Sequence, residues 1–400
     1  MIKTIKVQLL PNNKQNSLLF QSAGTARWAY NWALGKQIEH FENTGKLTKI
    51  SDSTLRKELT QLKRTEDFKW LYNYSNNITK QAVKDLCGAI DKFHFESKKN
   101  GYQYRESAIK SGRKLTFRDF KFFPRFKSKH KSEPAFYHDT EKIKFTKTHV
   151  QLEKLGKIKL AENERIPINV KYSNPRITFD GLNWFLSVGI EQVESVSNQY
   201  SEPIGIDLGI KATAIISDNR EFKNINKTKR VKKATKRLKR LQRRASKQYL
   251  KLKKGQEKSK NLIKLETRIR KTHKRLKDIR TNYTHQITAA LVKTKPKFIV
   301  IEDLNVSGML KNRHLSKAIQ QQNFYEFRRQ LTYKAQFNNI ELIIAPRFFP
   351  SSKTCSHCGH VHKQLNLSDR VFKCPACSFE INRDLQAAQN LLAYGLSVVA

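Results

Sequence analysis

The chain has 400 residues, of which 38% are hydrophobic and 28% charged, so it is long enough for two or three domains and too apolar for a disordered chain. Lys and Arg number 79 against 34 Asp and Glu, which gives a formal net charge of +45. This excess runs through the whole chain and indicates nucleic acid as a partner, rather than an acidic membrane surface or a charge kept for solubility. No apolar run reaches the roughly 18 residues that span a membrane, and the N-terminus is too short and polar for a secretory signal, so we expect a cytoplasmic location.

The N-terminal half is predicted to hold one strand, a helical segment and then a run of short strands. Residues 1–12 predict a strand that ends at Pro11, and residues 15–98 predict helices. Residues 115–198 alternate between apolar and polar positions and are split by turns such as Asp180-Gly181, which is typical of a small β-barrel. We expect the first strand to belong to this barrel, with the helices inserted between. Two stripes at helical spacing mark the buried sides of the helices: Tyr30, Leu34, Ile38 and Phe41 in one, and Val83, Leu86, Cys87 and Ile90 in the other.

From about residue 200 the pattern changes to α/β. A hairpin is predicted from Ile204–Leu208 and Ala212–Ser217. Phe298–Ile301 and Ile340–Ala345 are nearly continuous apolar runs, which suits strands in the middle of a sheet that is covered on both faces. A last helix is predicted to start near Asn382.

A long basic segment, residues 227–294, lies between the hairpin and the first apolar strand. Its stretch 227–280 holds 25 Lys and Arg and three acidic residues. Apolar residues recur at spacings of three and four on both sides of Gly255, which predicts two helices that pack antiparallel along a narrow stripe. A solvated helical face is one interpretation of the charge, but so many like charges repel, and a phosphate backbone alongside explains them better. The side chains that we single out for nucleic-acid binding are Lys236, Arg240, Arg243 and Arg244.

Three acidic residues stand out because their neighbours are apolar. Asp207 lies in the run I-G-I-D-L-G, on the opposite face from its isoleucines, and Glu302 ends the run F-I-V-I-E. Asp384 opens a helix whose apolar stripe, three, four and seven residues further on, faces the same way. Taken singly, the three are explained as a turn acid, a strand-end surface acid and a helix-start acid. Together they predict a site for two Mg²⁺ or Mn²⁺ ions, because carboxylates hold such ions and two ions about 3.5–4 Å apart serve phosphodiester hydrolysis.

Four of the five cysteines form two pairs, Cys355-x2-Cys358 and Cys374-x2-Cys377, with 15 residues between them. This spacing predicts one tetrahedral zinc ion held by four thiolates. The ion is expected to be structural, in a module that faces nucleic acid. Three nearby histidines are expected not to bind it: His357, His360 and His362.

The order of these motifs resembles a known family. The sequence reads G-I-D-L-G-I, a basic helical insert, I-V-I-E-D-L-N, P-S-S-K-T-C-S-H-C-G, C-P-A-C and N-R-D-L-Q-A-A-Q-N. The chain resembles TnpB, the insertion-sequence-encoded RNA-guided DNA endonuclease that is related to compact type V CRISPR effectors. The resemblance is most specific over residues 200–395, and it extends to the N-terminal strand, the segment A-R-W-A-Y-N-W-A-L and the segment P-R-F-K at 124–127.

The resemblance implies a fold, a reaction and partners. The fold is multidomain α+β, with a RuvC-like nuclease domain of the RNase H type, an inserted zinc ribbon, a β-barrel wedge domain and a helical recognition domain. Asp207, Glu302 and Asp384 match the three catalytic acids, and the four cysteines match the zinc module that contacts target nucleic acid. The partners are a guide RNA from the transposon end and double-stranded DNA beside a short adjacent motif, with base pairing reading the sequence. One chain per RNA is expected, in a prokaryotic cytoplasm.

The resemblance also implies domain boundaries. They are 1–14 and 111–199 for the wedge domain, 15–110 for the recognition domain, 200–349 and 381–400 for the nuclease domain with its basic insert 227–294, and 350–380 for the zinc module.

A helix start in the recognition domain offers hydrogen-bond donors that are able to read bases of the short adjacent motif. Ordinary helix capping explains the same residues equally well. The candidates are Asn76, Asn77 and Lys80.

Three other functions share parts of this pattern. An RNA-guided DNA-binding repressor lacks cleavage, and the presence of all three acids argues against it. A transposase of the RNase H fold also uses three acids, but the zinc ribbon and the basic insert fit TnpB better. A compact type V CRISPR effector is a close variant, which a neighbouring repeat array in the genome would identify.

Overall fold

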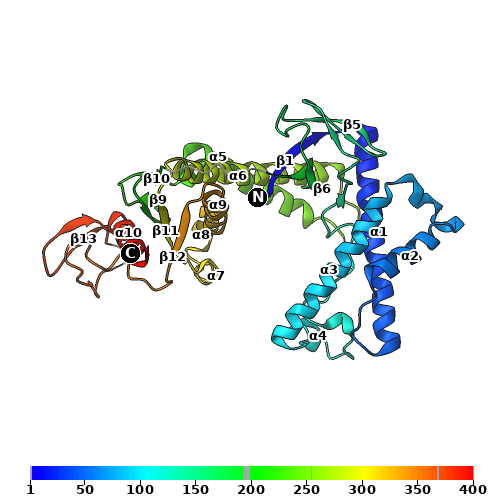
Figure 1. The fold of residues 1–400 in the computed structure, drawn as a ribbon, viewed down its shortest axis with the longest axis horizontal. Helices are drawn as coiled ribbons and strands as arrows, with labels where there is room; N and C mark the ends of the chain where they lie inside the picture. The colour runs from blue at the N-terminus through cyan, green and yellow to red at the C-terminus, as the bar shows by residue number, and fades with distance from the viewer. Residues whose placement is uncertain (1, 192–198, 254, 367–368, 400) are drawn as a thin grey trace. The chain divides into compact units, whose positions relative to one another are not determined.

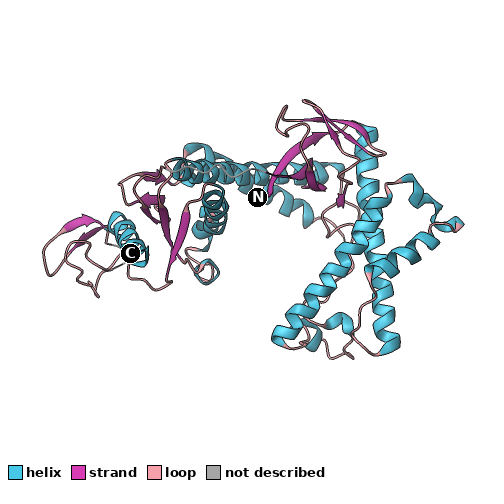
Figure 2. Cartoon of the chain, viewed as in Figure 1, coloured by secondary structure: helices cyan, strands magenta, loops and turns pink. Residues whose placement is uncertain are grey.

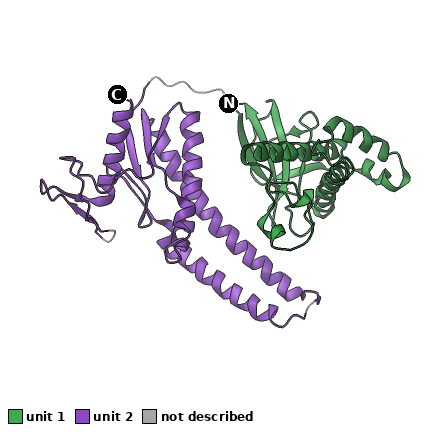
Figure 3. Cartoon of the chain, turned by 90° about the horizontal axis from the view of Figure 1, so that it is seen from below, with its two compact units in different colours: residues 1–192 green, residues 193–400 purple. Residues whose placement is uncertain are grey.

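The computed structural model describes residues 2–191, 199–253, 255–366 and 369–399 (Figure 1). It is an α+β protein (Figure 2) that divides into two compact units, residues 1–192 and 193–400 (Figure 3). The domain boundary that we predict between residues 199 and 200 follows residues 192–198, which lie outside the described residues. No helix in the described part of the chain is long and apolar enough to cross a membrane.

The first helix of unit 1 begins and ends where the sequence supplies caps. α1 (Asn13–Thr44) starts after Asn12, whose side chain accepts a hydrogen bond from the Gln15 N–H, and it ends at Gly45, whose φ of 64° is open to glycine without strain. α1 packs against α3 (Asn76–Asn100), and both predicted apolar stripes are buried in one core, which confirms them. The remaining helices are α2 (Asp52–Leu62), α4 (Glu106–Ile109) and the 3-10 helices η1 (Glu66–Asn73) and η2 (Phe117–Asp119).

A seven-stranded sheet completes unit 1, in the order β2-β6-β7-β1-β5-β4-β3. The first strand, β1 (Ile2–Leu10), pairs antiparallel with β7 and β5, so it joins the later strands as predicted, with the helices inserted between. The turn that contains Asp180 and Gly181 joins β6 to β7, where Phe179 pairs with Trp184. The edge strands of this ladder are β2 and β3. The bounds are β2 (Ala135–Tyr137), β3 (Lys144–Phe145), β4 (His149–Leu152), β5 (Gly156–Leu160), β6 (Tyr172–Phe179) and β7 (Trp184–Glu191).

Unit 2 is built on a five-stranded sheet in the order β10-β9-β8-β11-β12. β8 (Ile204–Asp207) pairs antiparallel with β9 (Ala212–Ile216) and parallel with β11 (Phe298–Glu302), which pairs parallel with β12 (Glu341–Ala345). These strands confirm the predicted hairpin and the central position of Phe298–Ile301, and β10 (Glu221–Lys223) forms one edge. The central position predicted for Ile340–Ala345 is wrong: β12 is the other edge strand, and Ile344 is 38% exposed because no described strand pairs with the outer side of β12. Because β8, β11 and β12 are parallel, their carboxyl ends lie at one edge of the sheet, where ligands of α/β proteins usually bind.

Helices cover both faces of this sheet. One face carries Ile206 and Ile301 and is covered by α6 (Lys260–Lys293) and α9 (Phe324–Phe337), with Phe327 in the shared core. The other face carries Val300 and is covered by α10 (Arg383–Val399), with Leu391 in the shared core. Burial on both sides explains why the apolar runs of β8 and β11 do not alternate with polar residues.

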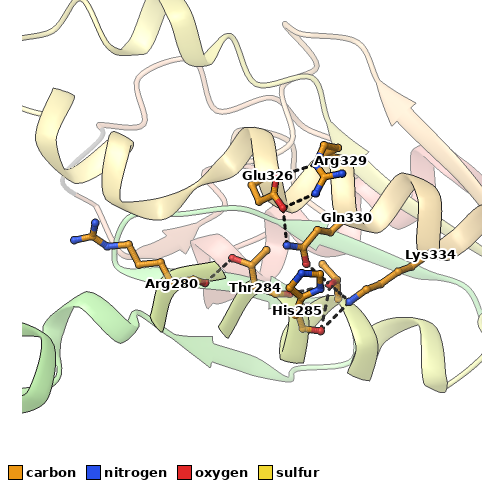
Figure 4. Close-up of polar contacts among 8 residues, drawn as sticks. Arg280, Thr284, His285, Glu326, Arg329, Gln330 and Lys334 are labelled. Carbon is orange, nitrogen blue, oxygen red and sulfur yellow. Dashed lines mark hydrogen bonds and ion pairs between the residues drawn. The ribbon is translucent and has the colours of Figure 1, made fainter. Parts of the chain in front are cut away.

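α9 is held on α6 by a polar network (Figure 4). Glu326 accepts hydrogen bonds from Arg329 and Gln330, and the Gln330 amide oxygen accepts one from the Thr288 hydroxyl at 3.2 Å. The Lys334 ammonium donates to the Thr288 hydroxyl at 2.6 Å, and burial lowers the pKa of Lys334 to about 8. The contacts of Gln330 and Lys334 with Thr288 of α6 fix the rotation of α9. No helix or strand is predicted between β11 and β12, and the structure adds three helices there: α7 (Val306–Met309), α8 (Ser316–Gln322) and α9.

The basic segment forms two long helices that lie side by side in Figure 3, after the short helix η3 (Ile225–Lys227). Leu241 of α5 (Lys229–Tyr249) clusters with Leu265 of α6, and Leu238 clusters with Leu276. Later residues of one helix thus meet earlier residues of the other, which confirms the antiparallel pair. The apolar stripe is narrow, and most other side chains of α5 are exposed and basic.

Candidate functional site

The carboxylates of Asp207 and Glu302 lie at the carboxyl ends of adjacent parallel strands. Ile206 pairs with Ile301 in the ladder, so Asp207 and Glu302 follow side by side, each as the last residue of its strand. Glu302 alternates with Val300, so its side chain lies on the face that α10 covers. Both acids are partly buried.

The third acid, Asp384, reaches the same place because α10 approaches β8 very closely. A Cβ atom on Gly205 would lie 2.1 Å from the Ala388 carbonyl oxygen and 2.6 Å from the Leu392 nitrogen. Only glycine allows this contact, which brings the first turn of α10 to the end of β8. Asp384 lies in that turn, one helical turn before Ala388. The sequence analysis singles out Asp384 but not Gly205.

Replacing Gly205 therefore tests how the third acid is positioned. Gly205→Ala is expected to push α10 away from β8 and to cost about 1–3 kcal/mol through overpacking, which lowers the melting temperature of a unit of this size by on the order of 5 °C. The measurement is thermal unfolding followed by circular dichroism. The matched control is Gly35→Ala in α1, where a Cβ meets nothing within 4 Å, and which we expect to leave the melting temperature unchanged or slightly raised. An unchanged melting temperature for Gly205→Ala would show that α10 does not need this approach.

The electrostatics of the three acids confirm that their charges interact. Burial, with the charges of Glu302 and Asp384, raises the pKa of Asp207 to about 8, while Arg383 opposes the shift. Burial raises the pKa of Glu302 to about 6. Arg383 and Asp384 form an ion pair at 3.3 Å, with 13% and 20% of their side chains exposed. A group of partly buried carboxylates, in which burial and two neighbouring acids raise the pKa of Asp207, is suited to a hard divalent cation that stabilises the charged forms.

A charged cluster that the sequence analysis missed lies next to Glu302. The Asp303 carboxylate pairs with Arg328 of α9 and with Arg347, each at 2.6 Å. These two guanidinium groups lower the pKa of Asp303. The charge of Asp303 is therefore balanced by two arginines, a pairing that distinguishes it from the adjacent Glu302, whose pKa is raised by burial.

The four cysteines form a tight group. Their sulfur atoms all lie within 4.8 Å of one another, with Cys355 and Cys377 3.7 Å apart and Cys358 and Cys374 3.5 Å apart. A tetrahedral zinc ion with Zn–S bonds of about 2.3 Å requires sulfurs about 3.8 Å apart, so the group fits one structural zinc. Among the described residues this is the one set of three or more Cys, His, Asp or Glu gathered so closely, and it includes none of the histidines.

The two halves of the zinc site share one local fold. In each, a cysteine carbonyl accepts a hydrogen bond from the N–H four residues further on, at 2.9 Å: Gly359 to Cys355, and Ser378 to Cys374. Gly359 and Ser378 both have positive φ, 74° and 58°. Tight turns of this kind bring both sulfurs of each pair to one ion. The second turn lies between β13 (Val371–Lys373) and β14 (Glu380–Asn382), which leads directly into α10.

The zinc site is tied to the helix that carries Asp384. The buried side chain of Asn390 donates to the Ser351 and Thr354 carbonyls at 2.6 and 2.7 Å. The buried side chain of Gln386 donates to the Thr354 carbonyl at 2.6 Å. Thr354 immediately precedes the first zinc ligand, so the first turns of α10 and the zinc turns support each other.

At the start of α3, the two asparagines that are candidates for base recognition are hydrogen-bonded to other protein side chains. The Asn76 amide oxygen accepts from Lys63 at 2.5 Å, and the Asn77 amide donates to Asp139. Lys80 is exposed. Burial, with the charges of Lys80 and Lys154, lowers the pKa of Lys63 to about 8. The two asparagines thus hold this helix start in place, and they would have to leave these partners to meet a base.

The candidates in the basic segment lie on the exposed side of α5. All four side chains are exposed, as a phosphate-binding surface requires: Lys236, Arg240, Arg243 and Arg244.

Three families match separate stretches of the chain. The family described as "Probable transposase" matches residues 186–313, which include Asp207 and Glu302. The family described as "Cas12f1-like, TNB domain" matches residues 324–391, which include Asp384 and the four cysteines. The family described as "Helix-turn-helix domain" matches residues 1–46.

Relatives match over the whole chain as well as over parts of it. The chain is 28% identical to "Putative RNA-guided DNA endonuclease InsQ" of Escherichia coli (strain K12), over 100% of this chain and 94% of that protein. It is 32% identical to "TnpB-like protein L79" of Acanthamoeba polyphaga mimivirus, over 34% of this chain and 27% of that protein. A solved structure, "Cryo-EM structure of the Cas12f1-sgRNA-target DNA complex", has a TM-score of 0.36 and 17% identity, over 98% of each chain.

Proposed function

Since the chain belongs to the TnpB family of insertion-sequence proteins, we propose that it is a transposon-encoded endonuclease that a bound RNA guides to double-stranded DNA. The observation that carries this proposal is the convergence of Asp207, Glu302 and Asp384 at one edge of the sheet in unit 2. The charge of +45 supports two nucleic-acid partners, a guide RNA from the transposon end and the target DNA.

The five-stranded sheet supports a RuvC-like nuclease domain of the RNase H type. Its strands β8, β11 and β12 are parallel, β9 is antiparallel to β8, and the acids lie at the carboxyl ends of β8 and β11 and on α10. We assign residues 200–349 and 381–400 to this domain and residues 350–380 to the zinc module. The seven-stranded sheet, residues 1–14 and 111–199, is the proposed wedge domain, and residues 15–110 are the proposed recognition domain. A closed barrel remains a prediction for the wedge domain.

In the proposed reaction the three carboxylates hold Mg²⁺ or Mn²⁺. When bound, two such ions activate a water molecule and stabilise the leaving oxygen of the phosphodiester. Asp207 and Glu302 supply ligands from strands that are fixed by the sheet, and Asp384 supplies one from a helix that is fixed by Gly205. Asp303 keeps its two arginines beside Glu302, where they counter the charge of the DNA backbone. The exposed cations of α5 are proposed to contact phosphates of the guide RNA or its duplex with the target.

Cation binding is testable without cleavage, because mutual repulsion of the acids destabilises the cation-free fold. At a Mg²⁺ or Mn²⁺ concentration of 100 times Kd, binding stabilises the fold by about 2.7 kcal/mol, which raises the melting temperature by roughly 5–10 °C. Asp207→Asn is expected to melt higher than the parent protein in cation-free buffer and to lose most of the Mn²⁺-induced shift. Asp218→Asn is the control, since Asp218 is exposed and pairs with Arg220. Equal shifts in the parent protein and in Asp207→Asn would contradict a cation site at these acids.

The experiment that tests the function begins with the RNA that co-purifies with the protein. A discrete RNA with one constant part and one variable end is expected on sequencing. The complex, given Mg²⁺ and double-stranded DNA that matches the variable end, is then expected to cut beside one short motif selected from a randomised flank. Tight binding to matched DNA without a cut product would favour a repressor, and strand transfer without RNA would favour a transposase.

A further inference from the structure

A cavity of about 280 Å³ lies beside the candidate catalytic acids, and none of the roles above uses it. Glu302 lines it directly, and so does Leu208, the residue after Asp207. Its apolar wall continues with Ile301, Leu304 and Phe324. The cavity is therefore a neighbour of the site where a phosphodiester would be cut, with room for a flat, partly apolar group.

Two cations at the rim of the cavity are held in a fixed orientation. Arg328 and Arg347 line the cavity, and each pairs with Asp303 at 2.6 Å. Because Glu302 also lines the cavity, two carboxylates meet two guanidinium groups there, and the attraction for a phosphate comes from the guanidinium groups rather than from a net positive charge. A guanidinium that is fixed in this way is suited to bind phosphate oxygens through its remaining N–H groups.

An exposed aromatic ring completes the rim. Tyr325, at the start of α9, lines the cavity and has 73% of its surface exposed, although an aromatic side chain of this size is usually covered. Its neighbour Phe324 is 3% exposed and anchors the helix start in the core. The network of Glu326, Gln330 and Thr288 on α6 fixes the rotation of α9, and with it the placement of Tyr325 and Arg328 (Figure 4).

From this arrangement we propose that the cavity is a nucleobase pocket, which holds one unstacked base of the DNA strand being cut. The base stacks on Tyr325 against the apolar wall, and Arg328 and Arg347 bind the phosphates that flank it. Aromatic stacking together with cations along the backbone is how proteins hold single strands without reading their sequence. A base inside a duplex cannot enter such a pocket, so the strand must be unpaired at this nucleotide. This inference rests on the proposed function and adds to it the residues that hold the strand next to the cut.

The stacking contact is tested by pairing a protein variant with a matching change in the DNA. The RNA complex cuts a set of targets in which each nucleotide near the cut in turn lacks its base. At one position the abasic target is expected to be cut about tenfold more slowly than the intact one. Tyr325→Ala is expected to slow cutting of the intact target by a similar factor. On that abasic target the variant is expected to cut almost as fast as the parent protein, because the ring and the base form a single contact that either change removes. Tyr325→Phe keeps the ring and is expected to stay within about twofold of the parent rate.

The phosphate contact is tested with targets that carry one neutral methylphosphonate linkage near the cut. Arg328→Gln and Arg347→Gln are each expected to slow cutting of normal DNA about tenfold. On the target whose matching linkage is already neutral, each variant is expected to cut at nearly the same rate as the parent protein. Arg329→Gln is the matched control. Arg329 is the next cation on α9, but it pairs with Glu326 and does not line the cavity. Its rate is expected to stay within twofold on every target.

Base stacking is also measurable without cleavage. In the Asp207→Ala complex, a 2-aminopurine at the position found in the abasic series is expected to lose fluorescence on binding, and Tyr325→Ala is expected to restore it. Two results together would contradict the nucleobase pocket. The fold-changes in cleavage rate from Tyr325→Ala and from the missing base would multiply at every position, and the fluorescence change would be the same with and without Tyr325. Those results would not contradict the proposed endonuclease function, because the parent complex still cuts DNA. A parent complex that cuts no DNA overturns the proposed function instead.

Discussion

Asp207→Ala is expected to abolish DNA cleavage while leaving guide RNA and target binding intact. Asp207 ends the central strand β8, and burial together with the charges of both other acids raises its pKa. Loss of this ligand removes cation stabilisation of several kcal/mol from the transition state, so the single-turnover cleavage rate should fall by about 10³-fold or more. The measurement is the rate of product formation at saturating complex, with filter binding of matched DNA as the parallel readout.

The control for this variant is Asp218→Ala. Asp218 belongs to the same unit, but it is exposed and pairs with Arg220 in the turn between β9 and β10. Its rate is expected to equal that of the parent protein. Cleavage at the parent rate by Asp207→Ala would remove Asp207 from the catalytic site, and loss of target binding would show that Asp207 supports the fold or the DNA contact instead.

Periodicity predicted most of the elements because burial follows it. The stripes of α1 and α3 are buried, and the apolar runs of β8 and β11 form adjacent parallel strands with helices on both faces. The apolar run of β12 did not predict its place in the sheet, since β12 is an edge strand. The segment before β12 is the main omission. Phe324, Phe327, Leu331 and Ala335 are spaced three, four and four apart and would have predicted α9.

Only part of the candidate site could be predicted from the sequence. Local pattern identified the acids and the cysteines, since each is placed by its own strand, helix or turn. Contacts between distant segments carry no local signal. Asp303 pairs with arginines 25 and 44 residues away, and Asn77 bonds to Asp139, 62 residues away. The need for glycine at position 205 depends on the carbonyl of Ala388, which only the packed structure shows.

The largest expected effect on the fold of unit 2 comes from removing the zinc. Structural zinc contributes roughly 10–16 kcal/mol of binding free energy to small zinc domains, and few apolar residues surround the four cysteines here. By atomic absorption, the parent protein is expected to hold one zinc ion per chain, and the paired variant Cys374→Ser, Cys377→Ser is expected to hold none. Limited proteolysis should then cut within residues 350–380.

Loss of zinc is also expected to reach the catalytic site through α10. Gln386 and Asn390 donate to the Thr354 and Ser351 carbonyls, which the zinc turns hold in place. When these turns open, two buried amides lose their acceptors, at about 1–3 kcal/mol each, and the first turn of α10 loosens with Asp384 on it. Cleavage should therefore fall at least tenfold even on targets that stay bound. Cys87→Ala, which alters a buried cysteine in unit 1, should keep one zinc per chain and the parent cleavage rate. A zinc-free protein that still cuts at the parent rate would show that Asp384 is positioned by Gly205 and the sheet alone.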